Sequence, residues 1–264
     1  MGEHVGVASD MAGVVAKDTA AVEPGGQSEK RHERGASSRP TGLRKFLYEN
    51  GLSLVLIGLF LGTMVGQVAA GLLAHNEEQR EHGQPELGLG EYLTSGAFIE
   101  ATAENWESEF LQMGMFVILT VYLRQKGSAE SKEPYDEEDD VDQDPRQCAN
   151  DPGVPWPVKK GGIVLWLYSN SLFLAFVLLF LVSFVAHAYG GALDHSEEQA
   201  AHGQLGVTTL QYMGTSRFWF ESMQNWQSEF LSLAAMVVFS IWLRQHGSPE
   251  SKPVAHPHAK TASD

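Results

Sequence analysis

Histidine and glutamate side chains recur in a short segment that occurs twice in the chain. The first copy, residues 75–84, reads HNEEQREHGQ, and the second, residues 195–204, reads HSEEQAAHGQ. On a helix, His75, Glu78 and His82 lie at i, i+3 and i+7, which places them on one face. Imidazole and carboxylate groups on one face are ligands for zinc or another divalent metal that accepts nitrogen and oxygen. We predict four metal ligands and two further candidates from this segment: Glu78, His82, Glu198 and His202, with His75 and His195 in addition.

The same segment has two other interpretations. It is also typical of a polar helix end that leaves a membrane, with glutamate and glutamine side chains in solvent, or of a proton or small-ligand site. Its spacing differs from the Glu-x-x-His of di-iron bundles and from His-Glu-x-x-His. The glycines at the end of each copy, Gly83 and Gly203, predict that each helix stops there.

A second segment is repeated as ENWESEFL at residues 104–111 and QNWQSEFL at residues 224–231. On a helix, Asn105, Ser108 and Glu109 share one face. A carboxylate at the start of a membrane span is a candidate for proton or ligand binding. The alternative is that these polar groups join helices by hydrogen bonds. The candidates from this segment are Asn105, Asn225, Glu109 and Glu229.

The two copies of this segment differ in charge. Glu104 and Glu107 are replaced by glutamine in the second copy, whereas Glu109 is matched by Glu229. We therefore expect the charge of Glu104 and Glu107 to be dispensable, and the charge of Glu109 and Glu229 to matter.

One ionisable residue, His187, lies inside a long apolar block and aligns with Gln67 of the first half. His187, Asp194 and Glu198 lie at i, i+7 and i+11, again on one face, if the glycine pair 190–191 does not break the helix. This pattern fits a polar stripe that leads inward from the surface. It also fits a single hydrogen bond between helices, which we favour.

Four apolar blocks must position these segments. Residues 52–74 and 172–193 are long enough to cross a bilayer. Residues 110–123 and 230–243 have about 14 residues each, and they reach the required length when extended back through the second repeated segment. A soluble four-helix bundle is the alternative, but the third block lacks the polar face that such a helix needs. We predict an all-α membrane protein with four transmembrane helices.

The chain contains an internal duplication at an offset of 120 residues. Residues 47–132 align without gaps with residues 167–252, and about 35 of the 86 aligned positions are identical. Each copy holds two of the apolar blocks, so the chain returns to its starting side. We therefore predict two tandem two-helix repeats in parallel orientation, related by a pseudo-twofold axis along the membrane normal.

Basic residues predict the orientation and the division of the chain. The segments within each repeat hold only Arg80 and Arg217, whereas the other flanks of the blocks hold Arg44, Lys45, Arg124, Lys126, Lys159, Lys160 and Arg244. We predict a multi-pass protein of the cell (plasma) membrane with both termini in the cytoplasm. The expected parts are a disordered tail at 1–42, repeats at 43–132 and 161–252, an acidic linker containing proline at 133–160, and a tail at 253–264.

Composition narrows the function classes. The net charge of −15 excludes a basic nucleic-acid-binding protein, and one cysteine excludes a disulfide-stapled miniprotein. The predicted partner is the lipid bilayer, with a homo-oligomer left open. We weigh a non-enzymatic four-helix membrane bundle first, and then a protein that binds or transports a metal ion, proton or small ligand at the pseudo-twofold axis. The third interpretation is a metal-dependent membrane enzyme, which no nucleophile–base, phosphate-loop or nucleotide motif supports. A divalent metal is the only cofactor that the residues suggest.

Several motifs together resemble a known family. They are EEQxxHGQ, the YLTSG stretch that begins at Tyr92, NWESEFLQMG, and RxxGSAESK, and they cover residues 47–132 and 167–252. This combination resembles an uncharacterised, domain-of-unknown-function family of bacterial multi-pass membrane proteins. The resemblance implies an integral protein of the cell membrane and supplies no established activity.

Overall fold

The computed structural model describes residues 41–134 and 140–261. This part of the chain is helical and contains no strand, in agreement with the predicted all-α class. The helices are α2 (Leu43–Glu49), α3 (Gly51–Glu81), α4 (Leu89–Tyr92), α5 (Gly96–Tyr122), η2 (Asp140–Asp142), α6 (Trp156–Lys160), α7 (Gly162–Ser169), α8 (Ser171–Ala201), α9 (Thr209–Met213) and α10 (Ser216–Phe239).

Two of the described helices, α3 and α8, are long and apolar enough to cross a membrane. Each has 31 residues, or about 46 Å at 1.5 Å per residue, and contains one of the two long predicted blocks. The shorter predicted blocks lie in the C-terminal parts of α5 and α10, which have 27 and 24 residues. α10 ends at Phe239, before the predicted block ends.

The predicted helix ends are confirmed. α3 stops at Glu81 and α8 at Ala201, and Gly83 and Gly203 follow with φ of +67° and +69°. Glycine adopts this left-handed conformation without the steric cost that a Cβ atom brings. The glycine pair 190–191 does not break α8, which is continuous as the predicted stripe requires.

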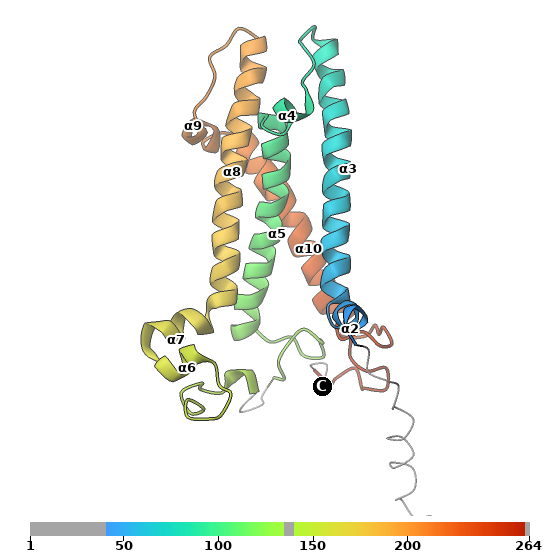
Figure 1. Cartoon of the computed structure of the whole chain (residues 1–264), viewed down its shortest axis with the longest axis vertical. Coiled ribbons are helices and arrows are strands. Elements are labelled where there is room, and N and C mark those ends of the chain that lie inside the picture. The colour runs from blue at the N-terminus through green and yellow to red at the C-terminus, as the bar shows by residue number, and fades with distance from the viewer. Residues whose placement is uncertain (1–40, 135–139, 262–264) are drawn as a thin grey trace, which may run out of the picture. The chain divides into compact units, whose positions relative to one another are not determined.

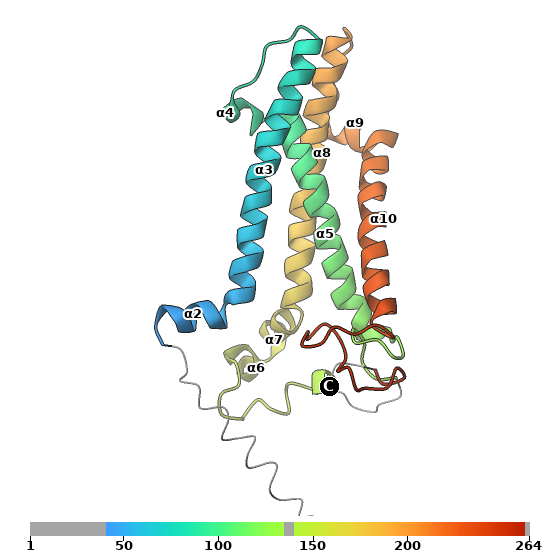
Figure 2. The ribbon, with the colours of Figure 1, turned by 90° about the vertical axis from the view of Figure 1, so that its right-hand side faces the viewer.

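The chain divides into two compact units, one ending at Met64 and the other beginning at Val65. The described part of the first unit is α2 and the start of α3, whose apolar side chains are mostly exposed. In the second unit, α5 lies between α8 and α10, and α8 runs along most of its length (Figures 1 and 2). α9 follows the long loop after α8 and packs back against that helix (Figure 1).

Glycines allow α5 and α8 to approach closely where they cross. A Cβ atom at Gly190 would lie 2.5 Å from the backbone nitrogen of Glu100, and one at Gly96 would overlap the backbone of Asp194. Small residues at a helix crossing let two backbones meet in this way. The crossing brings the first turns of α5 against the C-terminal half of α8.

The second unit buries ionisable groups beside a small apolar core and exposes many of its large apolar side chains. Glu107 and His187 are completely buried, whereas Leu178 and Val182 on α8 are about 60% exposed. Soluble proteins seldom bury ionisable groups completely and usually place large apolar side chains inside. The inverted pattern is typical of helices surrounded by lipid.

Candidate metal centre

The centre is built around His187, which is completely buried on α8. Its Nδ1 atom lies 2.8 Å from Oε2 of Glu107 on α5. The second oxygen of Glu107 accepts a hydrogen bond from Trp226 Nε1 on α10 at 2.9 Å. Because a carboxylate only accepts hydrogen bonds, the Nδ1 atom of His187 carries a proton and donates it to Glu107. Glu107 thereby fixes both the orientation and the tautomer of the imidazole ring.

The other ring nitrogen of His187 faces two carboxylates. Nε2 is buried and has no hydrogen-bond partner among the described residues, and it lies 3.5 Å from Oε2 of Glu221 on α10. One ligand atom each from Glu100, His187 and Glu221 lies within 4.8 Å of the other two. In the part of the chain that the structure describes, these three residues are the one group of this kind.

Tyr212 holds the two carboxylates together. Its hydroxyl group donates to Glu221 Oε2 at 2.6 Å and lies 2.7 Å from Glu100 Oε1. Burial, followed by the neighbouring carboxylates, raises the pKa of Tyr212, so the group stays a hydroxyl donor. The Tyr212 ring lies directly over Gly191 of α8, where a Cβ atom would overlap it.

Arg217, at the start of α10, connects this centre to the C-terminal end of α8. Its guanidinium group donates to Glu221 Oε1 at 2.9 Å, to Glu198 Oε2 at 2.6 Å and to Asp194 Oδ2 at 3.2 Å. It also lies 3.4 Å from His195 Nδ1. One cation thus contacts three carboxylates, and those of Asp194 and Glu221 are partly buried.

The donor set suits a divalent cation. Metal-binding histidines usually donate their other ring N–H to a carboxylate, which is the arrangement of His187 with Glu107. At bonds of about 2.1 Å, two ligands of a tetrahedral ion lie roughly 3.4 Å apart. The distance from His187 Nε2 to Glu221 Oε2 is 3.5 Å and matches that separation. Glu100, on α5, would supply a third ligand oxygen.

The structure places several predicted residues at or next to this centre. His187 lies in it, and its bond to Glu107 is the hydrogen bond between helices that the sequence favoured. Glu198 and His195 join it through Arg217. His75 Nε2 lies 3.1 Å from Gln79 Nε2 on its own helix, and Glu78 is exposed.

The predicted ligands His82 and His202 contact their own helices instead. His82 Nδ1 lies 2.9 Å from the carbonyl oxygen of Glu78, and His202 Nδ1 lies 2.9 Å from that of Glu198. Among the described residues the structure does not bring these four into a group that could hold one ion. Metal binding by this set stays a prediction.

The candidates of the second repeated segment are not among the three residues that form the centre. Asn105 donates to the carbonyl oxygen of Ala101 at 2.7 Å, and Asn225 to that of Glu221 at 3.2 Å. Glu109 is exposed, whereas Glu229 is partly buried. A proton or ligand role for these four also stays a prediction.

The contacts of Glu107 argue against the expectation that its charge is dispensable. Glu107 is completely buried and its two oxygens hold His187 and Trp226. The glutamine at the aligned position, Gln227, marks a difference between the two halves at the centre. His187 also aligns with a glutamine, Gln67. Both ionisable residues of this pair therefore stand against glutamine in the other half.

Sequence reasoning also missed Glu100, Tyr212, Arg217 and Glu221. A signal for three of them exists in the alignment, because Glu100 stands against a phenylalanine, and Arg217 and Glu221 stand against alanines. These differences between the halves put ionisable residues at one of the two sites that the duplication relates. Tyr212 is matched by Tyr92 and gave no such signal.

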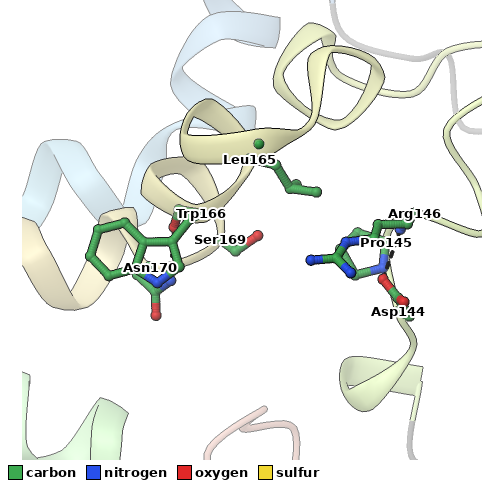
Figure 3. Close-up of a pocket in the computed structure, with 8 residues that line it drawn as sticks. Asp144, Pro145, Arg146, Leu165, Trp166, Ser169 and Asn170 are labelled. Carbon is green, nitrogen blue, oxygen red and sulfur yellow. Dashed lines mark hydrogen bonds between the residues drawn. The ribbon is translucent and has the colours of Figure 1, made fainter.

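A hollow of about 330 Å³ lies elsewhere, near the start of α8 (Figure 3). In Figure 3 the Arg146 side chain points across it toward Ser169. None of the predicted candidates lines it; the lining residues are Asp144, Pro145, Arg146, Gly162, Leu165, Trp166, Ser169 and Asn170.

Comparison with known proteins identifies the family. A family model described as "Domain of unknown function (DUF6766)" matches residues 43–263, so the chain belongs to that family. No curated protein and no solved structure matches the chain.

Proposed function

We propose that this member of the DUF6766 family is a non-enzymatic, four-helix protein of the cell membrane that binds one divalent metal cation. The ligands are Glu100, His187 and Glu221. One observation carries the proposal: the buried Nε2 of His187 has no hydrogen bond of normal geometry among the described residues and faces Glu221 Oε2 at 3.5 Å, while Glu107 holds Nδ1. A buried polar atom normally has a partner, and a cation at this place would supply one.

The inverted polarity of the second unit supports the membrane part of the proposal. α3 and α8 are the two described helices with the length and composition of spans, and α5 and α10 would complete the four. The basic flanks favour termini in the cytoplasm, which would put the metal centre toward the outer side.

Contacts between aligned positions support the predicted pseudo-twofold axis. Gln112 Nε2 donates to Ser232 Oγ at 2.9 Å, and these residues are 120 positions apart, which is the offset of the duplication. On a twofold axis each residue meets its own equivalent. The loops after α3 and α8 also have equivalent hydrogen bonds. The aligned side chains of Asn76 and Ser196 each accept one from the backbone N–H of the loop residue 11 positions later.

The ligand chemistry favours a transition metal. Mg²⁺ and Ca²⁺ prefer sites made of oxygen alone, whereas one imidazole with two carboxylates suits Zn²⁺, Mn²⁺, Fe²⁺ or Co²⁺. Tyr212 and Glu107 act outside the ligand set, where they orient the carboxylates and the imidazole.

The residues of the centre have no counterparts at the positions 120 residues away in the duplication. The positions aligned with His187, Glu221 and Glu100 hold Gln67, Ala101 and Phe220. Gln67 donates to Thr102 Oγ1 at 3.0 Å. We therefore expect one metal ion per chain.

Elemental mass spectrometry of the detergent-purified protein, loaded with Zn²⁺ or Mn²⁺ and then dialysed, tests the proposal. We expect about one ion per chain in the native protein. His187→Gln, which introduces the residue of the first half, should lose it. The matched control is the double variant His82→Ala/His202→Ala, which should keep the ion. Loss in the control with retention in His187→Gln, or a native protein without metal, would overturn the proposal.

A further inference from the structure

Carboxylates of decreasing exposure lead from the outer end of α8 to the metal centre. The Glu198 side chain is 55% exposed, that of Asp194 25% and that of Glu221 19%, and His187 is completely buried. Glu198, Asp194 and His187 lie on one face of α8. Such a series offers an incoming cation oxygen ligands at every stage between solvent and the centre.

The side chain of Arg217 contacts all three carboxylates of this series. A different nitrogen of its guanidinium group contacts each carboxylate: Nη1 contacts Glu198, Nη2 contacts Asp194 and Nε contacts Glu221. A guanidinium group stays charged at every accessible pH and fits carboxylates through several donors. The path is therefore closed by a cation that belongs to the protein.

Glu221 is shared between Arg217 and the centre. Its Oε1 accepts from Arg217, and its Oε2 accepts from Tyr212 and faces His187 Nε2. A metal ion that binds Glu221 competes with Arg217 for the negative charge of this one carboxylate. The position aligned with Arg217 in the first half is Ala97, so the closing cation belongs to the same half as the ligands His187 and Glu221.

We propose that Arg217 is a tethered counter-ion that closes the route to the metal centre, and that an incoming divalent cation displaces it from Glu198 and Asp194. This inference rests on the proposed metal-binding function. Its physical basis is repulsion between the guanidinium charge and the entering cation, together with occupation of the oxygens that the cation needs. Charges along a route of this kind change association rates by about 10- to 1,000-fold.

Stopped-flow association of Zn²⁺ with the full-length, detergent-purified protein tests the inference, with loss of Zn²⁺ from a fluorescent chelator as the signal. We expect Arg217→Gln to associate at least about tenfold faster than the native protein. Arg217→Lys should lie between the two, because it keeps the charge but loses the fork of donors. The control is Arg80→Gln, whose arginine pairs with Glu86 at 3.3 Å, and it should leave the rate unchanged.

A second variant keeps the inference testable if Arg217→Gln does not fold. Glu198→Gln leaves Arg217 on Asp194 and Glu221 but neutralises the outermost carboxylate, so Zn²⁺ should associate more slowly at unchanged stoichiometry. An unchanged rate in Arg217→Gln, or in Glu198→Gln where Arg217→Gln does not fold, would overturn the inference while leaving the metal centre in place. A native protein that binds no Zn²⁺, Mn²⁺, Fe²⁺ or Co²⁺ would instead overturn the proposed function.

Discussion

His187 Nδ1 and Glu107 Oε2 lie 2.8 Å apart, and both side chains are completely buried. The two residues are 80 positions apart in the chain and come from different halves of the duplication. Each stands where the other half has glutamine, at Gln67 and Gln227. The ionisable pair therefore occupies one of two equivalent places, and glutamines hold the corresponding positions of the other.

Glu107→Gln should destabilise the protein by about 2–3 kcal/mol. Glu107 accepts hydrogen bonds from two donors, His187 and Trp226, and a glutamine offers only one oxygen, so one donor would face an NH₂ group. Adding His187→Gln should restore most of the loss, because the new amide at position 187 presents its oxygen to that NH₂ group. Denaturation curves in detergent measure both, and equal stabilities of the single and double variants would contradict this explanation.

Gly191→Ala should cost about 1–3 kcal/mol and weaken metal binding. The added Cβ atom would overlap the Tyr212 ring and would lie 2.7 Å from Glu100 Oε1, so both side chains must shift. Gly90→Ala is the control, because a Cβ atom there meets nothing within 4 Å. Thermal melting and metal content together check the prediction. A Gly191→Ala protein that melts and binds metal like the Gly90→Ala protein would show that this packing is unimportant.

Glu130→Gln should remove part of the pH dependence of stability. Burial, together with the nearby Glu250 charge, raises the pKa of Glu130 above its ordinary 4.5. A carboxyl group with a raised pKa contributes stability that is complete below its ordinary value and is lost as pH rises through the raised one. Glu130→Gln should therefore be more stable than the native protein at pH 8, with a smaller difference at pH 4. Melting temperatures across this range give the result, and parallel curves for the two proteins would refute it.

Lys252→Met should release the chain after residue 252 for proteolysis. Lys252 is completely buried, and its Nζ atom donates to the backbone oxygens of Gly127, of His258 at 3.0 Å and of Lys260 at 2.7 Å. Methionine cannot donate, so three carbonyl groups would lose their partner. Limited proteolysis with mass spectrometry should detect faster cleavage of the tail. The aligned Lys132 pairs with Asp142, and Lys132→Met should leave the tail protected.

Local features of the sequence determined the helices. Residues 52–74 and 172–193 predicted α3 and α8 because a long apolar run without charge needs no knowledge of its neighbours. Gly83 and Gly203 predicted where both helices end, since the left-handed conformation at that point depends on one residue. The match to a domain-of-unknown-function family agrees with the expectation of an uncharacterised family.

Only the tertiary structure decided which polar residues form the centre. Its three residues, Glu100, His187 and Glu221, are far apart in the sequence, and each comes from a different helix, α5, α8 or α10. Comparing the halves favoured Glu109 and Glu229, which are alike in both, whereas the centre uses Glu107 and His187, which differ. The physical reason is that the face of a helix that becomes buried depends on the helix packed against it. A charge on that face is tolerated only where the partner helix supplies its counterpart.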